Sequence, residues 1–303
     1  IWNDLRHAYK FGSLIRLDEK LKEKLKELEA KQGGKVLDLF ADADIREQKD
    51  FTEKFFNNLK EAVEKFANTD ADTFIANKTR DAITFLELLT TEYDVACANP
   101  PYTDSADLGT ELKNYVENHY RGTYKFHTNL YATFIKRCYE LTNGDGKIAM
   151  IHPRTFMFIK TFEDVRKFII NETHINVFVD YSLSNLFGSI MVDPAFYVLE
   201  KKVVENKKSW FISLDQYTRT PKEKYKKDIC LQALNDYNLH VNNEHNYSVL
   251  QSKLKGIKSY PFIYWISDQF RETFKGADIK SLLSPAQGAA TTNNLRFLRF
   301  LGK

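Results

Sequence analysis

The feature that most constrains this sequence is an Asn-Pro-Pro-Tyr tetrapeptide at residues 99–102, directly after a short apolar run. The run, residues 93–98, has the length and apolar character of a buried β-strand. In an open α/β sheet, ligands bind beyond the carboxyl ends of the strands. A polar side chain, two prolines and an aromatic ring at that position therefore predict a ligand site on an α/β fold.

The chemistry of the tetrapeptide suits an exocyclic amine on a planar base. The side-chain oxygen of Asn99 and the carbonyl of Pro100 can each accept one N–H of an NH₂ group. Pro101 has no backbone N–H to donate, and the pair of prolines stiffens the loop. Tyr102 can stack on the base. A plain turn that ends a strand is the alternative interpretation of the same four residues.

Strand and helix patterns alternate along the first two thirds of the chain. Helices are expected at residues 15–30, 45–66, 80–90, 106–118, 129–141 and 161–171, and strands at 93–98, 147–152, 175–181 and 195–201. Such alternation indicates an α/β domain with a parallel sheet. The last two strands, joined through residues 182–194, are expected to form a hairpin.

The net charge of +3 hides a difference between the two parts of the chain. Residues 1–200 have 26 Lys and Arg against 32 Asp and Glu, whereas residues 201–303 have 18 against 9. The regular pattern also ends near residue 205, where we expect a domain boundary. The basic part is a candidate surface for nucleic-acid phosphates, with an ordinary solvated face as the alternative. Its clustered cations are Lys222, Lys224, Lys226 and Lys227.

Cysteine and hydropathy patterns argue against metal and membrane sites. Cys97, Cys138 and Cys230 lack the spacing of metal ligands, so we expect reduced thiols in a cytoplasmic protein. No pair of histidines has helical metal spacing, so no metal site is expected. The most apolar stretch, residues 148–159, is too short to span a membrane. The chain begins at Ile1 rather than Met, and we expect it to be a fragment of a longer protein.

Further segments extend the pattern around the tetrapeptide: residues 129–134, 144–153, 162–168 and the Asn-Leu-Phe-Gly run at 185–188. Together with residues 99–102, they resemble the gamma class of N6-adenine DNA methyltransferases. Two end segments, residues 11–15 and 287–299, are similar to the long methyltransferases of BREX phage-defence systems, which are related to the Eco57I-like restriction–modification enzymes.

The resemblance implies a partial Rossmann-like, S-adenosyl-L-methionine-dependent methyltransferase fold at residues 1–204. The start of a basic target-recognition domain follows at 205–303. The implied reaction transfers a methyl group from S-adenosyl-L-methionine to N6 of a flipped-out adenine in double-stranded DNA. The implied setting is a restriction–modification or phage-defence system, with other defence subunits as candidate partners.

The family motif also assigns roles to individual residues. Asn99, Pro100, Pro101 and Tyr102 match the catalytic tetrapeptide. Tyr102 and Phe187 match the residues that stack on the two faces of the extruded base, which needs apolar cover after it leaves the duplex. In the basic region, the candidate DNA contacts are Lys222, Lys224, Lys226, Lys227, Arg296 and Arg299.

A complete methyltransferase of this kind also needs a glycine-rich loop for its cofactor. The one candidate, residues 35–44, has Ala-Asp-Ala-Asp where glycines are expected, and these carboxylates would oppose the carboxylate of the cofactor. We therefore expect the cofactor-binding segments to precede Ile1, and this chain alone to be inactive. Two alternatives stay open: an amino-methyltransferase that acts on a protein glutamine or on guanine N2, and a non-catalytic DNA-binding subunit.

Overall fold

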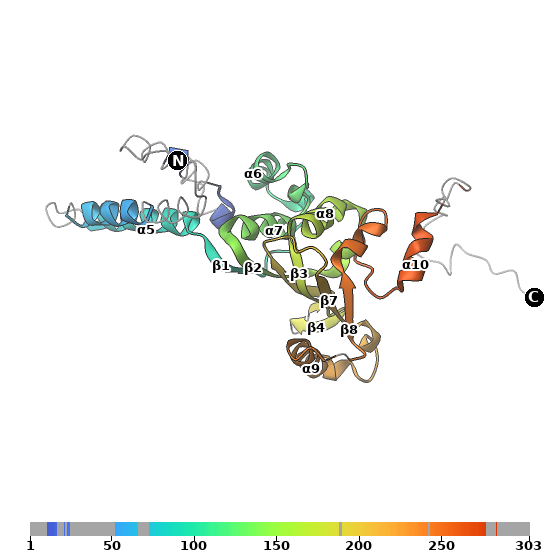
Figure 1. Cartoon of the computed structure of the whole chain (residues 1–303). Helices are drawn as coiled ribbons and strands as arrows, with labels where there is room; N and C mark the ends of the chain where they lie inside the picture. The colour runs from blue at the N-terminus through green and yellow to red at the C-terminus, as the bar shows by residue number, and fades with distance from the viewer. Residues whose placement is uncertain are drawn as a thin grey trace, which may run out of the picture.

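The structure is a computed structural model (Figure 1) that describes residues 11–16, 21, 23–24, 52–65, 73–187, 190–241, 243–276 and 283. The candidate cofactor loop at 35–44 and the C-terminal segment with Arg296 and Arg299 lie outside the described residues. The helices include α5 (Thr73–Thr90), α6 (Thr110–Tyr120), α7 (Leu130–Leu141), α8 (Glu163–Glu172), α9 (Lys226–Asn238) and α10 (Asp268–Glu272), and residues 52–65 are also helical.

Six strands form one sheet in the order β1-β2-β6-β3-β7-β8. Their bounds are β1 Tyr93–Ala98, β2 Thr142–Pro153, β3 His174–Asp180, β6 Pro194–Glu200, β7 Lys208–Ser213 and β8 Asn246–Leu250. Four of them, β1, β2, β3 and β7, run in the same direction, while β6 and β8 run against them. The predicted α/β class is therefore confirmed, as is the antiparallel hairpin of β3 and β6.

The two faces of the sheet pack against different helices. On β3 the buried side chains alternate: Phe178 faces the cluster that includes α7 and α8, and Val177 and Val179 face the cluster that includes α9. This two-residue period is the geometry of a strand, whose successive side chains point to opposite faces. Figure 1 accordingly shows α7 and α8 on one side of the sheet and α9 on the other.

The first strand of the described sheet does not match the buried strand expected from its apolar sequence. β1 pairs with β2 alone among the described strands, and the side chain of Val95 is 58% exposed. An apolar run predicts a strand but carries no information on whether that strand has one neighbour or two. The close pairing with β2 depends on Gly146, where a Cβ atom would lie 2.8 Å from the carbonyl oxygen of Asp94.

The sheet continues across the expected domain boundary at residues 204 and 205. Strand β7 pairs in parallel with β3, and β8 pairs with β7. Phe211 of β7 is buried in the same cluster as Phe178 of β3. The division at 204 and 205 stays a prediction about function, because the described residues on both sides of it share one sheet and one core.

A separate two-stranded hairpin follows β3 at the carboxyl edge of the sheet. It consists of β4 (Ser184–Phe187) and β5 (Ile190–Val192), which pair with each other outside the main sheet. None of the described helices is long and apolar enough to cross a membrane.

Candidate active site

The tetrapeptide forms the loop that leaves the carboxyl end of β1. Pro100 is buried, whereas Asn99 is exposed and Tyr102 is 36% exposed. The Tyr102 hydroxyl donates a hydrogen bond to Asn99 Oδ1 at 3.3 Å. Partial burial raises the pKa of Tyr102, so its hydroxyl keeps its proton at neutral pH. The structure therefore brings the amide oxygen and the aromatic ring together at the predicted edge of the sheet.

The far end of this loop is attached to the start of α7. Asp104 and Asn129 form an antiparallel bridge, and the Leu130 N–H donates to the Thr103 carbonyl at 3.0 Å. Asn129 Oδ1 also accepts the Tyr131 N–H at 3.1 Å, so this residue is the N-cap of α7. The helix was expected from sequence, but the bridge to Asp104 was not. With both ends held, the loop has a defined position relative to β1 and α7.

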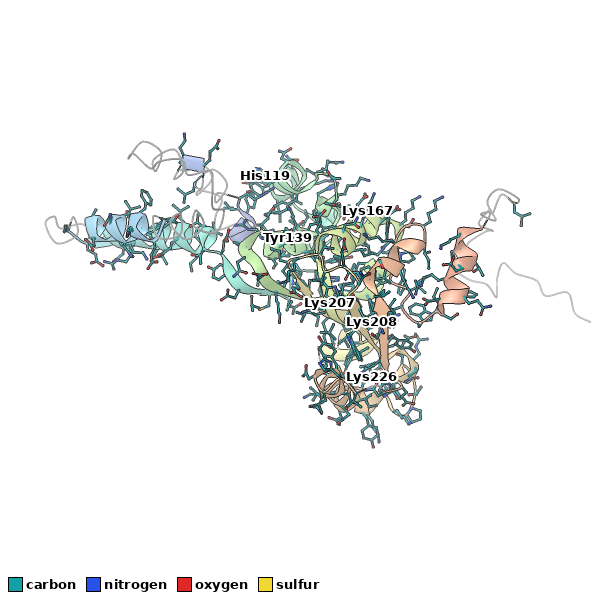
Figure 2. The ribbon with its side chains drawn as sticks, in the orientation of Figure 1. His119, Tyr139, Lys167, Lys207, Lys208 and Lys226 are labelled. Carbon is teal, nitrogen blue, oxygen red and sulfur yellow. The ribbon has the colours of Figure 1, made fainter. Side chains whose placement is uncertain are left out.

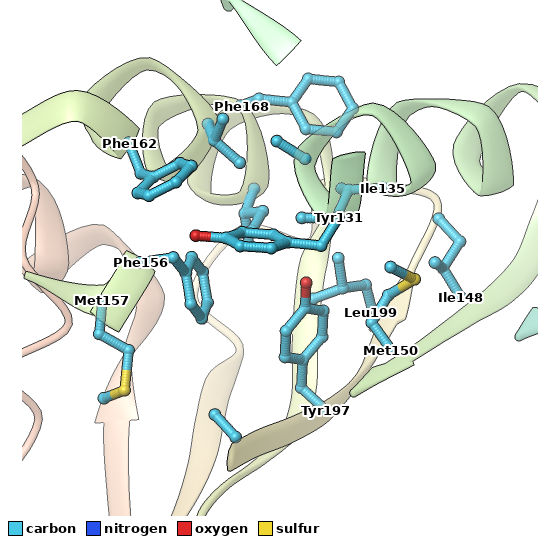
Figure 3. Packing of buried hydrophobic residues seen from close by; sticks show 14 of the residues in the cluster. Tyr131, Ile135, Ile148, Met150, Phe156, Met157, Phe162, Phe168, Tyr197 and Leu199 are labelled. Atoms are coloured by element: carbon cyan, nitrogen blue, oxygen red, sulfur yellow. The ribbon is translucent and has the colours of Figure 1, made fainter. Parts of the chain in front are cut away.

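A group of aromatic rings packs against the start of α7, the helix to which the loop is attached. His152 lies two residues beyond Met150, the partner of Ala98 in the β1–β2 pairing. Its ring stacks on Tyr131 with centroids 4.4 Å apart, and its Nε2 lies 2.8 Å from the Tyr197 hydroxyl. Figure 3 shows the Tyr131 ring between Phe162 on one side and Tyr197 on the other. The three rings of Tyr131, His152 and Tyr197 form a platform that connects α7 with β2 and β6.

The buried histidine of this platform is a packing residue. His152 is 0% exposed, and burial lowers its pKa to about 3. It is neutral at physiological pH, and its Nε2 is occupied by Tyr197. A group in this state is unsuited to exchange protons with a ligand at the loop. Sequence analysis does not separate this role from a catalytic one, because burial depends on the tertiary structure.

The loop offers hydrogen-bond acceptors to a ligand. Asn99 contributes a side-chain oxygen, and both prolines lack the backbone N–H that other residues would present. Asp104, the nearest carboxylate along the chain, accepts a hydrogen bond from the Ala106 N–H at 3.4 Å. No group of His, Cys, Asp or Glu that could hold a metal ion occurs among the described residues. The arrangement suits an amine whose two hydrogens are held by neutral oxygens.

The backbone of Phe187 lies in the β4–β5 hairpin, where it pairs with Ile190. The side chain of Phe187 lies outside the described part of the structure. Its stacking opposite Tyr102 therefore stays a prediction.

The four candidate DNA-contacting lysines do not share one surface. Lys222, Lys224 and Lys227 are exposed, but Lys226 is 2% exposed at the start of α9 (Figure 2). The Lys226 ammonium donates to the Leu183 carbonyl at 3.0 Å and to Thr218 Oγ1 at 2.8 Å. We therefore do not retain Lys226 as a DNA contact, because burial and these hydrogen bonds keep its charge inside the protein.

A charged cluster at the same edge of the sheet was missed by sequence analysis. Arg154, just after β2, contacts Asp180 at the end of β3 and Asp215 after β7, both at 2.9 Å. The available signal was the position of Arg154 and Asp180 next to the ends of two predicted strands. Because strands that run in the same direction end at the same edge, such residues are candidates for contact.

The chain belongs to the Eco57I restriction-modification methylase family, which it matches over residues 10–187. The family expected from the tetrapeptide and its flanking segments is therefore confirmed. The match includes β1, the Asn-Pro-Pro-Tyr loop, α7 and the strand β4 that ends at Phe187.

Two curated relatives are named as adenine-specific methyltransferases. The chain is 25% identical over 227 residues to adenine-specific methyltransferase PglX of Lacticaseibacillus casei (strain Zhang), covering 73% of this chain and 18% of that protein. It is 22% identical over 190 residues to adenine-specific methyltransferase BrxX of Escherichia coli O9:H4 (strain HS), covering 62% of this chain and 14% of that protein. The chain thus spans less than a fifth of the length of either relative.

The fold is also similar to that of the methyltransferase subunit of a type I restriction-modification system from Streptococcus thermophilus. The TM-score is 0.43 at 15% sequence identity, and the match covers 57% of this chain and 37% of that one.

Proposed function

We propose that this chain is the catalytic portion of an adenine-specific DNA methyltransferase of a restriction-modification or phage-defence system. The observation that carries the proposal is the placement of Asn99 and Tyr102 together at the carboxyl end of β1, in a chain of the Eco57I family. The names of the curated relatives support adenine as the target base. Double-stranded DNA is the proposed substrate, and other defence subunits are the proposed partners. The three free cysteines suit a cytoplasmic enzyme.

In this function the loop holds the N6 amine of an adenine that has left the duplex. Asn99 Oδ1 and the Pro100 carbonyl accept its two hydrogens, so that the nitrogen lone pair develops toward the methyl group to be transferred. Tyr102 covers one face of the base, and Phe187 covers the other. When it is bound, S-adenosyl-L-methionine supplies the methyl group and leaves as S-adenosyl-L-homocysteine, and the methylated amine releases one proton to solvent. Positioning and oriented acceptors account for the rate without a strong base.

The residues of the Asn-Pro-Pro-Tyr loop suit an amine nucleophile. The prolines remove two N–H groups that would otherwise compete for the nitrogen lone pair. The Tyr102–Asn99 hydrogen bond leaves a second lone pair on Asn99 Oδ1 for the amine, since a carbonyl oxygen has two.

The test uses the full-length protein and a mass-spectrometric analysis of its products. Wild type is expected to form N6-methyladenine in duplex DNA. Asn99→Ala is expected to lower the rate by about 10²–10³-fold, the loss seen when one oriented hydrogen-bond partner is removed from a reacting centre. Asn238→Ala, at an exposed asparagine that ends α9, is the matched control.

The chemical identity of the methylated product distinguishes the proposed function from its alternatives. N2-methylguanine or a methylated protein glutamine would show that the loop holds a different amine. DNA binding without any methylated product would favour the non-catalytic subunit. A rate in Asn99→Ala equal to that of wild type would exclude the proposed role of this residue.

A further inference from the structure

Arg154 joins the ends of several segments at the carboxyl edge of the sheet. Its Nη2 lies 2.9 Å from Asp180 Oδ2, and its Nη1 donates to Asp215 Oδ1 and to Ser182 Oγ, each at 2.9 Å. Its backbone N–H donates to the Asp193 carbonyl at 2.7 Å, and its Nε lies 4.0 Å from the Asp193 carboxylate. The side chain therefore contacts residues that follow β3 and β7, and the backbone N–H of the same residue is bonded to Asp193, which follows β5.

Two of these contacts lie on the two legs of the β4–β5 hairpin. Ser182 precedes β4, and Asp193 follows β5. The first leg has a second attachment, because the Lys226 ammonium donates to the Leu183 carbonyl at 3.0 Å. A two-stranded hairpin is marginally stable by itself in water. Because β4 and β5 pair outside the main sheet, the contacts at their legs help to position the hairpin.

The contacts of Arg154 are stronger than those of a surface ion pair. Asp180 is 1% exposed, and its burial raises its pKa to about 6 against the opposing effect of Arg154. Removal of one partner from a buried pair is costly, because the other charge is left without compensation. The Arg154 guanidinium is therefore held in place by the carboxylate that it neutralises.

Ser182 fixes the direction in which the chain leaves β3. Its φ of +61° lies in the left-handed region, which non-glycine residues adopt only where their surroundings hold them. Its hydroxyl accepts a hydrogen bond from Arg154 and donates one to Asp215 Oδ1 at 2.5 Å. These two bonds stabilise the turn from β3 into β4.

We propose that Arg154 is a positioning residue for the target base: its side chain holds the first leg of the β4–β5 hairpin, its backbone N–H holds the second, and the hairpin so placed sets Phe187 against the extruded adenine. This inference rests on the proposed function, in which Phe187 covers one face of the base. Arg154 itself contacts neither the base nor the cofactor in this proposal. Its side chain acts through Ser182, and its backbone N–H acts through Asp193.

The test compares two variants in the full-length enzyme. Arg154→Lys keeps a positive charge beside Asp180 but lacks the planar fork that reaches several oxygens at once. Ser182→Ala removes only the hydroxyl that joins the first leg to Arg154 and Asp215. Arg80→Lys, at an exposed arginine on α5, is the matched control.

The first readout is methylation of two DNA substrates, one with the target adenine paired and one with it opposite an abasic site. Extrusion costs least when the base is unpaired, so a badly placed stacking residue matters most for the paired substrate. For both variants we expect kcat/KM to fall about tenfold on the paired substrate and less than about threefold on the unpaired one. Equal losses on both substrates would show a merely structural role and overturn the proposal.

The second readout is hydrogen exchange, which does not depend on activity. We expect faster exchange at the amides of β4 and β5 in both variants, with β2 and β6 unchanged. Unchanged exchange in the hairpin would also overturn the proposal. Failure of the proposed function would look different, because wild type would then form no N6-methyladenine on either substrate.

Discussion

At the residue scale, the proposed site depends on a tyrosine that has two separable properties. The Tyr102 ring can stack on a base, and its hydroxyl donates to Asn99 Oδ1 at 3.3 Å. That hydrogen bond orients the amide group so that its oxygen is an acceptor at the loop. The stacking and the orientation of Asn99 are therefore distinct contributions from one side chain, and substitutions can separate them.

Tyr102→Phe keeps the ring and removes the hydroxyl, whereas Tyr102→Ala removes both. Stacking of a base on an aromatic side chain contributes about 1–3 kcal/mol, and a single neutral hydrogen bond contributes about 1 kcal/mol. We expect Tyr102→Ala to lower kcat/KM on duplex DNA more than Tyr102→Phe does. Steady-state methylation kinetics measure the difference. Equal losses in the two variants would mean that the hydroxyl, and not the ring, carries the contribution of this residue.

At the element scale, the loop is placed by α7, β2 and β6 rather than by its own sequence. The Asp104–Asn129 bridge attaches it to α7, and the Tyr131–His152–Tyr197 platform joins that helix to two strands. His152 has no exposed surface, so its protonation in the folded state would bury a positive charge. The platform therefore connects the stability of the fold to pH.

Because burial lowers the pKa of His152 to about 3, the unfolded chain binds a proton that the folded chain does not bind below the ordinary histidine pKa. The contribution of His152 to the free energy of unfolding is fully present above about pH 6.5. Below that pH it falls by up to about 1.4 kcal/mol for each pH unit, down to the pKa of the folded state. Chemical denaturation at a series of pH values measures this slope. His127, His174 and His245, whose pKa values are also lowered by burial, add to the wild-type slope.

His152→Phe should make the slope shallower, because a stacked ring remains but no longer titrates. Tyr197→Phe is the matched control: it removes the same hydrogen bond and leaves the buried histidine in place, so the slope should stay steep. An unchanged slope in His152→Phe would show that this histidine is not the group whose protonation opposes folding.

At the scale of the whole molecule, the basic C-terminal third is the candidate DNA surface, but its lysines have different environments. Residues 201–303 have 18 Lys and Arg against 9 Asp and Glu. Lys222, Lys224 and Lys227 are exposed, while the charge of Lys226 is buried and hydrogen-bonded. Phosphate contacts by exposed lysines release counterions and make binding dependent on salt.

Replacement of Lys222, Lys224 and Lys227 by Glu should weaken DNA binding and make the plot of log affinity against log salt shallower, by about 0.9 for each phosphate that the variant no longer neutralises. Lys226→Met should leave that slope unchanged and lower the free energy of unfolding by about 1–3 kcal/mol, because its two acceptors lose a buried donor. Fluorescence anisotropy over a salt series and chemical denaturation measure the two effects.

Glu at three exposed lysines of the N-terminal part, Lys54, Lys78 and Lys113, gives a control with the same change of charge. If this control and the C-terminal variant change the slope equally, the effect comes from net charge and not from a local DNA contact.

Local sequence patterns determined several secondary-structure elements of this chain and its family. The apolar run before Asn99, the turn residues that follow it, and the helical pattern at 129–141 each depend on neighbours in sequence, so they predicted β1, the loop and α7 correctly. The tetrapeptide and its flanking segments also indicated the family. Strand propensity, capping and proline stiffness act over a few residues and can be recognised without the rest of the fold.

The contacts and the burial of side chains that depend on strand order were decided only by the tertiary structure. The Arg154 contacts to Ser182 and Asp215 join residues 28 and 61 positions apart, and they exist because β2, β3 and β7 run in the same direction and end at one edge. Burial of Lys226 and His152, and the exposure of Val95 on β1, likewise follow from which elements become neighbours. A side chain's partners and solvent are set by the packing of distant segments, and local sequence contains little of that information.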